Sequence, residues 1–282
     1  MFQTDLFKGR TILITGGGTG LGRSMALRFA EVGANLFLVG RREEPLIETC
    51  EAIRAKGGRA TYASADVRDF AAVEKVIDLA EKEFGSVDTL VNNAAGNFIA
   101  RTEKLSPNAF NAVVGIVLQG TFHFTLALGR KWIAAKQPGN VLNIVTTYAA
   151  TNAGSGFVVP SACAKAGVLA LTRSLAVEWA RHHIRLNAIA PGPFPTEGAW
   201  SRLMPNEQIQ QQAKERHPMK RFGRHEELAN LAVYLLSSQA DYVNGECVVI
   251  DGGLWLRGAG EFNDFLDMPD AAWDRLESAR KK

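Results

Sequence analysis

The stretch Thr11–Gly22, with the sequence TILITGGGTGLG, decides the fold of this chain. Its first five residues predict a strand, and Gly20–Val32 has the periodicity of a helix. Glycine tolerates positive φ angles, and a helix N-terminus offers free N–H groups to a phosphate. The strand, turn and helix together predict a dinucleotide site rather than an ordinary tight turn. The residues assigned to this site are Gly16, Gly18, Thr19, Gly20, Leu21 and Gly22.

Apolar strands and amphipathic helices alternate along the rest of the chain. Strands such as Ile12–Ile14 and Val248–Ile250 are apolar throughout, as expected when both faces of a sheet are covered. The pattern predicts an α/β fold with a doubly wound, Rossmann-type parallel sheet. The other expected strands are Asn35–Val39, Arg59–Ala63, Val87–Val91, Asn140–Val145, Ile184–Ile189 and Cys247–Ile250. The other expected helices are Glu43–Lys56, Phe70–Phe84, Pro107–Ala135, Ser161–His182 and Glu226–Ser237.

We expect one domain, residues 1–282, with its core at 11–253. The segment Pro191–Pro218 is rich in proline, glutamine and charge, and it predicts a small lid over the carboxyl ends of the strands. Residues 254–282 form a C-terminal extension. Its aromatic residues predict that it packs on its own domain or on a neighbouring subunit. They are Trp255, Phe262, Phe265 and Trp273.

Composition argues against several classes of protein. The net charge is only +3 and is spread along the chain, so binding to nucleic acid is not expected. No apolar run approaches the roughly 20 residues that span a bilayer, so no membrane is expected. Cys50, Cys163 and Cys247 are far apart and predict neither disulfides nor a metal cluster. No metal site is expected, and a reducing cytoplasm is the default location.

The end of the second expected strand indicates which nicotinamide cofactor binds. An acidic residue there would bind a ribose hydroxyl of NAD, but this chain has Arg41 and Arg42. Two guanidinium groups suit a 2′-phosphate, so we predict NADP, with Arg41 the preferred ligand. The alternative is a solvated pair of arginines bonded to Glu43 or Glu44. Four residues past the third and fourth strands are also assigned to the cofactor: Asp66, Val67, Asn93 and Ala94.

Four motifs together resemble the short-chain dehydrogenase/reductase family. They are the turn Thr15–Gly22, the Asn-Asn-Ala element Asn92–Gly96, the dipeptide Pro191–Gly192 and the late Asp251–Gly253. The resemblance runs from residue 11 to about 253, so it covers most of the chain. It implies the same α/β fold, a nicotinamide cofactor and assembly as a homotetramer.

The family's usual catalytic motif, Tyr-x-x-x-Lys with an upstream Ser, is altered here. Lys165 is present, but Ser161 stands four positions before it, and Thr146 takes the place of the upstream Ser. Of the four tyrosines, Tyr148 follows the strand Asn140–Val145 at the edge where α/β folds bind ligands. If that strand continues, Tyr148 shares a face with Thr146. We predict a catalytic role for Tyr148, and the alternative is a packed loop aromatic.

This combination resembles one branch of the family, the 2,4-dienoyl-CoA reductases, which also carry Ser-x-x-x-Lys and a relocated tyrosine. The matching stretches are Asn92–Ile99, Gly154–Pro160, Pro191–Pro193, Thr196–Arg202 and Gly260–Asp264. The resemblance implies NADPH-dependent reduction of a conjugated C=C bond in a 2,4-dienoyl-CoA thioester, giving 3-enoyl-CoA. The alternatives are a trans-2-enoyl-CoA or 3-oxoacyl thioester reductase, or a catalytically silent NADP-binding subunit.

The resemblance also implies roles for individual residues. Asn97 and Tyr148 would donate hydrogen bonds to the thioester oxygen, and Ser161 would support Tyr148 or a water molecule. Lys165 would bind the nicotinamide ribose. The carboxamide end of the cofactor would lie against Pro191, Gly192, Phe194 and Thr196, and the coenzyme A moiety would meet Arg68, Phe98 and Arg202. Two features depart from the family pattern: Gln119 replaces a common Asn, and the loop Ala149–Ala153 is longer.

Overall fold

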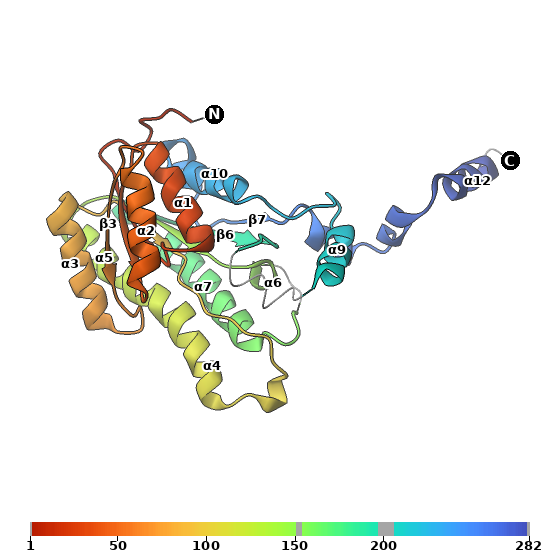
Figure 1. Cartoon of the computed structure of the whole chain (residues 1–282), viewed down its shortest axis with the longest axis horizontal. Coiled ribbons are helices and arrows are strands. Elements are labelled where there is room, and N and C mark those ends of the chain that lie inside the picture. The colour runs from red at the N-terminus through yellow and green to blue at the C-terminus, as the bar shows by residue number, and fades with distance from the viewer. Residues whose placement is uncertain (1, 151–153, 197–205, 281–282) are drawn as a thin grey trace.

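A parallel sheet of seven strands forms the centre of the computed structural model, which describes residues 2–150, 154–196 and 206–280 (Figure 1). The strand order is β3-β2-β1-β4-β5-β6-β7, and each neighbouring pair is parallel. Strands are added toward one edge from β1 to β3 and toward the other edge from β4 to β7, which confirms the doubly wound prediction. The strands are β1 (Thr11–Thr15), β2 (Asn35–Gly40), β3 (Arg59–Ser64), β4 (Thr89–Asn92), β5 (Gly139–Ile144), β6 (Ile184–Pro191) and β7 (Cys247–Ile250).

Helices cover both faces of the sheet. On one face lie α1 (Gly20–Glu31), α2 (Glu43–Arg54) and α10 (His225–Leu236). On the other lie α3 (Phe70–Phe84), α5 (Gly120–Ala135) and α7 (Val159–Glu178). Alternate residues of each strand therefore enter two separate cores. Ile12 and Ile14 of β1 pack with Phe29 of α1, whereas Leu13 packs with Phe124 of α5. Burial on both sides explains the apolar run Ile12–Ile14 in β1. The same expectation is wrong for Val248–Ile250, because β7 is an edge strand and Val249 is 40% exposed.

The longest helical segment runs from Pro107 to Ala135, as the sequence predicts. It consists of α4 (Pro107–Val114), a π-helical turn η2 (Gly115–Gln119) and α5. The expectation that no apolar stretch reaches membrane-spanning length is wrong. By length and composition alone, this helix is long and apolar enough to cross a membrane. Yet 56% of its most apolar window is buried. Leu128 and Trp132 pack under the sheet, as in the core helix of a globular protein.

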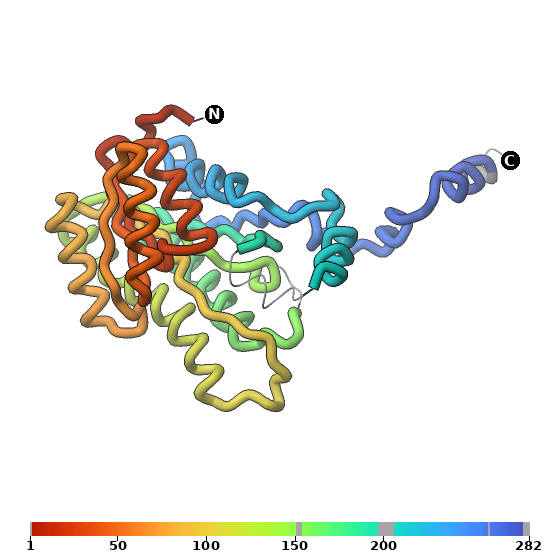
Figure 2. Tube along the Cα trace, viewed as in Figure 1, coloured from red at the N-terminus to blue at the C-terminus, as the bar shows by residue number. Residues whose placement is uncertain are grey.

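The segment after β6 contains one described helix, α9 (Glu207–Arg216), in the region predicted to be a lid. The C-terminal extension follows β7 and contains α11 (Leu254–Ala259), η5 (Asn263–Asp267) and α12 (Asp270–Arg280). Figures 1 and 2 show the end of this extension projecting away from the body. Phe262 and Phe265 stack on each other at 6.3 Å, and Phe262 is 74% exposed. Phe265 also contacts Trp273 at 6.1 Å, so three of the four aromatics pack on one another, whereas Trp255 is half-buried. Packing of the extension on its own domain or on a neighbouring subunit stays a prediction.

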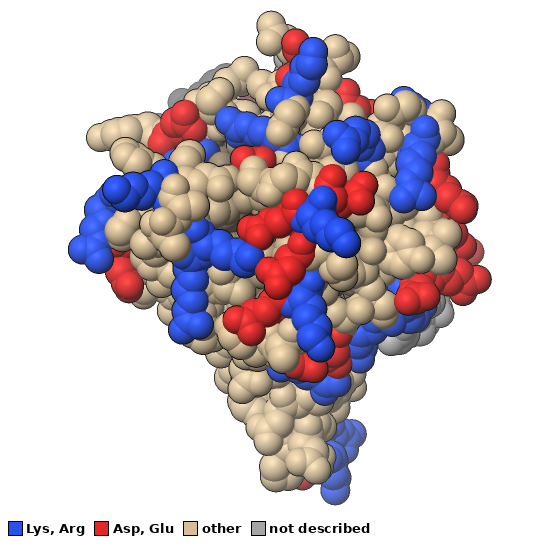
Figure 3. Space-filling model, turned by 90° about the vertical axis from the view of Figure 1, so that its left-hand side faces the viewer, with Lys and Arg blue, Asp and Glu red and all other residues tan. Residues whose placement is uncertain are grey.

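Charged side chains of both signs are interspersed on the face that carries α3, at the left of Figure 1 (Figure 3). Lys131 of α5, for example, reaches Glu81 of α3 at 2.7 Å and Asp78 at 2.9 Å. Exposed pairs of this kind contribute little to stability, typically below about 1 kcal/mol. The core described above therefore dominates the folding energy.

Candidate active site

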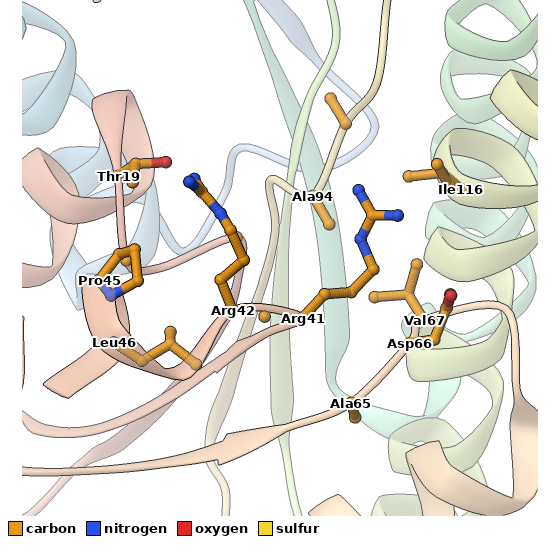
Figure 4. Close-up of a pocket in the computed structure, with 14 residues that line it drawn as sticks. Thr19, Arg41, Arg42, Pro45, Leu46, Ala65, Asp66, Val67, Ala94 and Ile116 are labelled. Atoms are coloured by element: carbon orange, nitrogen blue, oxygen red, sulfur yellow. The ribbon is translucent and has the colours of Figure 1, made fainter. Parts of the chain in front are cut away.

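A cavity of about 440 Å³ lies at the carboxyl ends of the first strands of the sheet (Figure 4). Most of its wall comes from the loops that follow β1, β2, β3 and β4. The lining residues are Gly16, Gly18, Thr19, Gly40, Arg41, Arg42, Pro45, Leu46, Ala65, Asp66, Val67, Ala94, Ala95 and Ile116. This set contains seven of the residues that the sequence predicts for the cofactor: Gly16, Gly18, Thr19, Arg41, Asp66, Val67 and Ala94. Arg42 lines the cavity beside them.

The glycine turn needs its glycines. Gly16 has φ +67° and Gly20 has φ +52°, conformations that other residues rarely adopt. A Cβ atom at Gly22 would lie 2.1 Å from the carbonyl oxygen of Gly16, so only glycine fits at the start of α1. The amide groups at this helix end can therefore approach a pyrophosphate, which is the fit that a dinucleotide requires.

Residues after β4 hold the glycine turn in place. The hydroxyl of Thr15 accepts hydrogen bonds from the backbone N–H groups of Asn93 and Ala94, both at 3.1 Å. The side-chain amide of Asn93 donates to the carbonyl oxygens of Thr15 and Gly16, at 3.2 and 3.1 Å. Asn93, which was predicted to contact the cofactor, thus holds the glycine turn in its shape.

Arg41 and Arg42 project from the end of β2 into the cavity (Figure 4). The side chain of Arg42 points toward Thr19, and that of Arg41 lies on the side of Val67 and Asp66. Among the described residues, neither arginine forms an ion pair with the glutamates that follow. The structure therefore does not show the alternative, in which the two arginines are bonded to Glu43 or Glu44. Two guanidinium groups in one cavity favour an anionic ligand.

Asp66 and Arg68 form a bonded pair beside that cavity. The Nε atom of Arg68 donates to the two oxygens of Asp66 at 2.9 and 3.1 Å, and Arg68 holds the pKa of the carboxyl at about 2. The two residues were predicted to contact different ligands, the nicotinamide cofactor for Asp66 and coenzyme A for Arg68. The structure brings them together, so Arg68 also positions Asp66. Phe98 is 36% exposed, and Arg202 lies outside the described residues.

Three predicted catalytic side chains come together beyond β5. The hydroxyl groups of Tyr148 and Ser161 are hydrogen-bonded at 3.0 Å. Ser161 and Lys165 lie one turn apart on α7, and both side chains are buried. The ammonium group of Lys165 donates to the carbonyl oxygen of Ile144, the last residue of β5. Tyr148 is thus a hydrogen-bonded member of the site, and the packed-aromatic alternative does not account for this bond.

The reason given for placing Tyr148 is wrong, however. The strand does not continue to this residue: β5 ends at Ile144, and the short helix α6 (Thr147–Ala150) carries Tyr148. The carbonyl oxygen of Thr146 accepts the N–H groups of Ala149 and Ala150 and so begins this helical turn. A helical turn, rather than strand alternation, directs the phenol toward Ser161. Residues 151–153 of the longer loop lie outside the described residues.

Asn97 is on the exposed loop after β4. Its side-chain oxygen accepts the backbone N–H of Phe98 at 2.9 Å. The carboxamide oxygen is therefore engaged, which leaves the NH₂ group of Asn97 as the donor to a ligand. The structure brings Asn97 to the same edge of the sheet as Tyr148, and the described contacts include no hydrogen bond between the two side chains.

The predicted nicotinamide-side residues continue from β6, which ends at Pro191. Gly192 packs against Asp251, and a Cβ atom there would lie 2.6 Å from the Cβ of Asp251, so there is no space for a side chain. Phe194 is buried against Gly223. The methyl group of Thr196 would be 3.2 Å from a Cβ atom at Gly20, so Thr196 lies over the start of α1.

Sequence reasoning missed two contributors to this edge. Ile116 lines the cavity from the π-helical turn η2, and no motif indicated it. His225, which stands just before the expected helix Glu226–Ser237 and was given no role there, bridges Ser24 of α1 at 2.8 Å and the carbonyl oxygen of Pro195 at 2.6 Å. This bridge ties the segment after β6 to the helix that follows the glycine turn.

Burial lowers the pKa of Lys165 to about 8, because the charged ammonium group is removed from water. If the charged form supports catalysis, kcat should fall as the pH rises through about 8. In the unfolded chain the pKa of Lys165 is higher, about 10.5. The unfolded state therefore binds more protons than the folded state between about pH 8 and 10.5. As the pH rises through that window, the contribution of Lys165 makes folding more favourable. The titration of Lys165 would therefore not itself cause unfolding in that window.

The measurement is kcat from pH 6.5 to 10, with thermal unfolding followed in parallel. A rate that stays level up to pH 10 would remove the Lys165 charge from the reaction.

A family model described as enoyl-(acyl carrier protein) reductase matches residues 16–255. The chain belongs to the short-chain dehydrogenase/reductase family. This assignment agrees with the resemblance that the sequence motifs indicate, and members of the family are oxidoreductases that use a nicotinamide cofactor. The match ends where the C-terminal extension of this short-chain dehydrogenase/reductase begins.

Two relatives of this short-chain dehydrogenase/reductase are named as dienoyl-CoA reductases. The probable 2,4-dienoyl-CoA reductase of Bacillus subtilis, named as (2E)-enoyl-CoA-producing, is 47% identical over 88% of this chain and 97% of its own. The probable 2,4-dienoyl-CoA reductase 3 of Caenorhabditis elegans, named as (3E)-enoyl-CoA-producing, is 44% identical over 99% of this chain and 91% of its own.

Solved structures share the fold. A short-chain dehydrogenase from Bacillus anthracis has a TM-score of 0.80 and 43% identity, covering 88% of this chain and 97% of its own. A gluconate 5-dehydrogenase from Burkholderia cenocepacia, solved in complex with NADP and tartrate, has a TM-score of 0.82 and 32% identity, covering 90% and 98%. The second structure contains NADP in a protein of this fold.

Proposed function

We propose that this protein reduces 2,4-dienoyl-CoA thioesters to 3-enoyl-CoA with NADPH. The observation that carries the proposal is the hydrogen bond between Tyr148 and Ser161 beside the buried Lys165. Ser161 holds the position where a carbonyl reductase of this family has its tyrosine, and the phenol approaches from α6 instead. The relatives named as dienoyl-CoA reductases support the same substrate class.

The reaction consumes one hydride and one proton. NADPH, when bound, supplies the hydride that adds to C5 of the dienoyl chain. The electron pair of the C4=C5 bond then moves through the conjugated system, and negative charge develops on the thioester oxygen. Tyr148 and Asn97 would donate hydrogen bonds to that oxygen, and donors of this kind are each worth on the order of 3 kcal/mol. A proton from water then forms the C–H bond at C2, leaving the double bond between C3 and C4.

We infer that NADP is the cofactor from the two arginines after β2. Arg41 and Arg42 point into the cavity that begins at the glycine turn (Figure 4). An acidic residue at this place would repel a 2′-phosphate, whereas a guanidinium group binds it through charge and paired hydrogen bonds. The Burkholderia structure with NADP is consistent with this choice.

The position of the final proton decides the product. Protonation of the dienolate at C2 gives a 3-enoyl thioester, and protonation at C4 gives a 2-enoyl thioester. The two relatives carry names of both kinds, (2E) in Bacillus subtilis and (3E) in Caenorhabditis elegans. We propose the 3-enoyl product because Tyr148 would be occupied at the thioester oxygen and so would not serve as a proton donor at C4.

The experiment that tests the function follows NADPH loss at 340 nm with three thioesters: 2,4-dienoyl-, trans-2-enoyl- and 3-oxoacyl-CoA. We expect turnover of the dienoyl thioester, and a single deuterium at C2 of the product when the reaction runs in D₂O. Faster turnover of either other thioester would favour a rival reductase, and deuterium at C4 would assign the 2-enoyl product. NADPH binding without any turnover would indicate a silent binding subunit.

The homotetrameric assembly and the cytoplasmic location stay predictions. Light scattering of the purified protein would measure the first, and fractionation of its source cells the second. Substrate contacts by Arg68, Phe98 and Arg202 are likewise part of the proposal.

A further inference from the structure

Helix α9 has almost no apolar packing of its own. None of its described side chains is buried, and Ile209, its largest apolar residue, is 40% exposed. The N-terminal end is capped by Asn206, whose side chain accepts the backbone N–H of Ile209 at 2.8 Å. A polar helix of ten residues is only marginally stable in water. Contacts at its other end therefore decide whether α9 keeps its place.

Those contacts come from the C-terminal extension. Arg257, in α11, donates from Nη1 to the carbonyl oxygens of Glu215 and Arg216, at 3.0 and 2.9 Å. These are carbonyl groups of the last turn of α9, which have no partner within the helix and form its negative end. The Arg257 side chain is only 18% exposed, so this capping interaction is partly shielded from water.

Asp267 and Lys220 complete the connection. Asp267, at the end of η5, accepts a hydrogen bond from Nη2 of Arg257. Lys220, just after α9, donates to Asp267 at 3.4 Å and to the carbonyl oxygen of Glu215 at 2.9 Å. The hydrogen bond from Lys220 is the main cause that lowers the pKa of the Asp267 carboxyl. Two cations and one carboxylate therefore join the end of α9 to the extension.

The extension itself is fixed to the sheet. Asp251, directly after β7, accepts the N–H groups of Gly253 at 2.9 Å and Trp255 at 2.8 Å, which anchors the start of α11. The side chain of Asn263 donates to the carbonyl oxygens of Leu256 and Arg257, at 3.1 and 2.9 Å. Hydrogen bonds thus connect the end of β7 to α11, and α11 to the end of α9.

The segment that carries α9 also starts and ends over the cofactor edge. It leaves β6 at Pro191, passes Thr196 above the start of α1, and returns at His225, whose ring bonds the carbonyl oxygen of Pro195. Figure 1 shows α9 at the same end of the molecule as α6, which carries Tyr148. The family match ends at residue 255, so Arg257 belongs to the part beyond it.

We propose that the C-terminal extension holds α9 in the arrangement that binds the acyl-CoA substrate, with Arg257 as the positioning residue. The substrate half of this statement rests on the proposed function. Arg257 contacts carbonyl groups and Asp267 rather than the reacting atoms, so its removal affects substrate affinity more than the chemical step.

The test compares Arg257→Ala and Arg257→Lys with wild type in the full chain. We expect Arg257→Ala to raise KM for dienoyl-CoA about tenfold, with kcat within about twofold and NADPH affinity unchanged. Amide hydrogen exchange in residues 207–216 should become about tenfold faster. Arg257→Lys should recover part of both effects, because it keeps the charge and loses the fork of donors. The matched control is Arg275→Ala, since Arg275 bonds only Ala271 of its own helix among the described contacts.

Two results would overturn the proposal. Unchanged exchange in α9 after Arg257→Ala would show that the arginine does not hold the helix. Faster exchange with an unchanged KM would show that α9 does not help to bind the substrate. Failure of the proposed function looks different, because the wild-type protein would then not turn over dienoyl-CoA at all, and the exchange comparison would still report on the contact between Arg257 and α9.

Discussion

Replacing Tyr148 with phenylalanine should reduce kcat for dienoyl-CoA by about 100-fold or more, with NADPH affinity nearly unchanged. The substitution removes only the hydroxyl group that bonds Ser161 at 3.0 Å and would stabilise the charge on the thioester oxygen. That bond is realised in the transition state, so the loss should appear in kcat and in kcat/KM together. Steady-state kinetics and fluorescence titration with NADPH measure the two quantities.

Two further variants make this result specific. Tyr242→Phe is the matched control, because Tyr242 is fully exposed outside the site and its hydroxyl group should not affect the rate. Ser161→Ala removes the partner of Tyr148 and should lower kcat less than Tyr148→Phe does, because the phenol itself remains. A near-normal rate for Tyr148→Phe would exclude the phenol from the mechanism.

The second large effect concerns the choice of cofactor. Arg41→Ala should raise KM for NADPH at least tenfold and change KM for NADH little, because only NADPH carries the 2′-phosphate that a guanidinium binds. The KM for NADPH of Arg42→Ala, measured in the same way, shows how much each arginine contributes to phosphate binding. The two side chains point to different parts of the cavity (Figure 4).

Lys56→Ala is the matched charge control for the cofactor experiment. Lys56 lies just past the other end of α2 and pairs with Glu31, so its removal changes the net charge without entering the cavity. Equal weakening of NADPH and NADH by Arg41→Ala would contradict the phosphate assignment.

The sheet could be predicted from sequence because its signals are local. The strand β1, the glycine turn and α1 follow one another within a short stretch, and burial on both faces made central strands such as β1 and β2 largely apolar. The predicted strand Val87–Val91 is observed as Thr89–Asn92, a shift at its ends only. Such ends depend on hydrogen bonds with neighbouring strands, which the sequence pattern does not contain.

The side-chain pairings could not be predicted in the same way. Asp66 and Arg68 are two positions apart, but their hydrogen bonds depend on the turn after β3. Tyr148 reached its partner through a helical turn, although strand alternation had been the argument. Arg257 bonds carbonyl groups 41 and 42 positions earlier, a separation at which periodicity carries no information. The site roles assigned by resemblance remain predictions for the experiments above.

The π-helical turn Gly115–Gln119 has a consequence for how the long helix can change. One additional residue in a turn rotates everything after it by about 100° about the helix axis. Ile116, in this turn, lines the cavity and also packs against the core cluster that contains Phe124. Removing a single residue here would straighten the turn and rotate Phe124 relative to Ile116, so one of these contacts would be lost. Insertions and deletions should therefore be tolerated far less in this turn than in the surface loops.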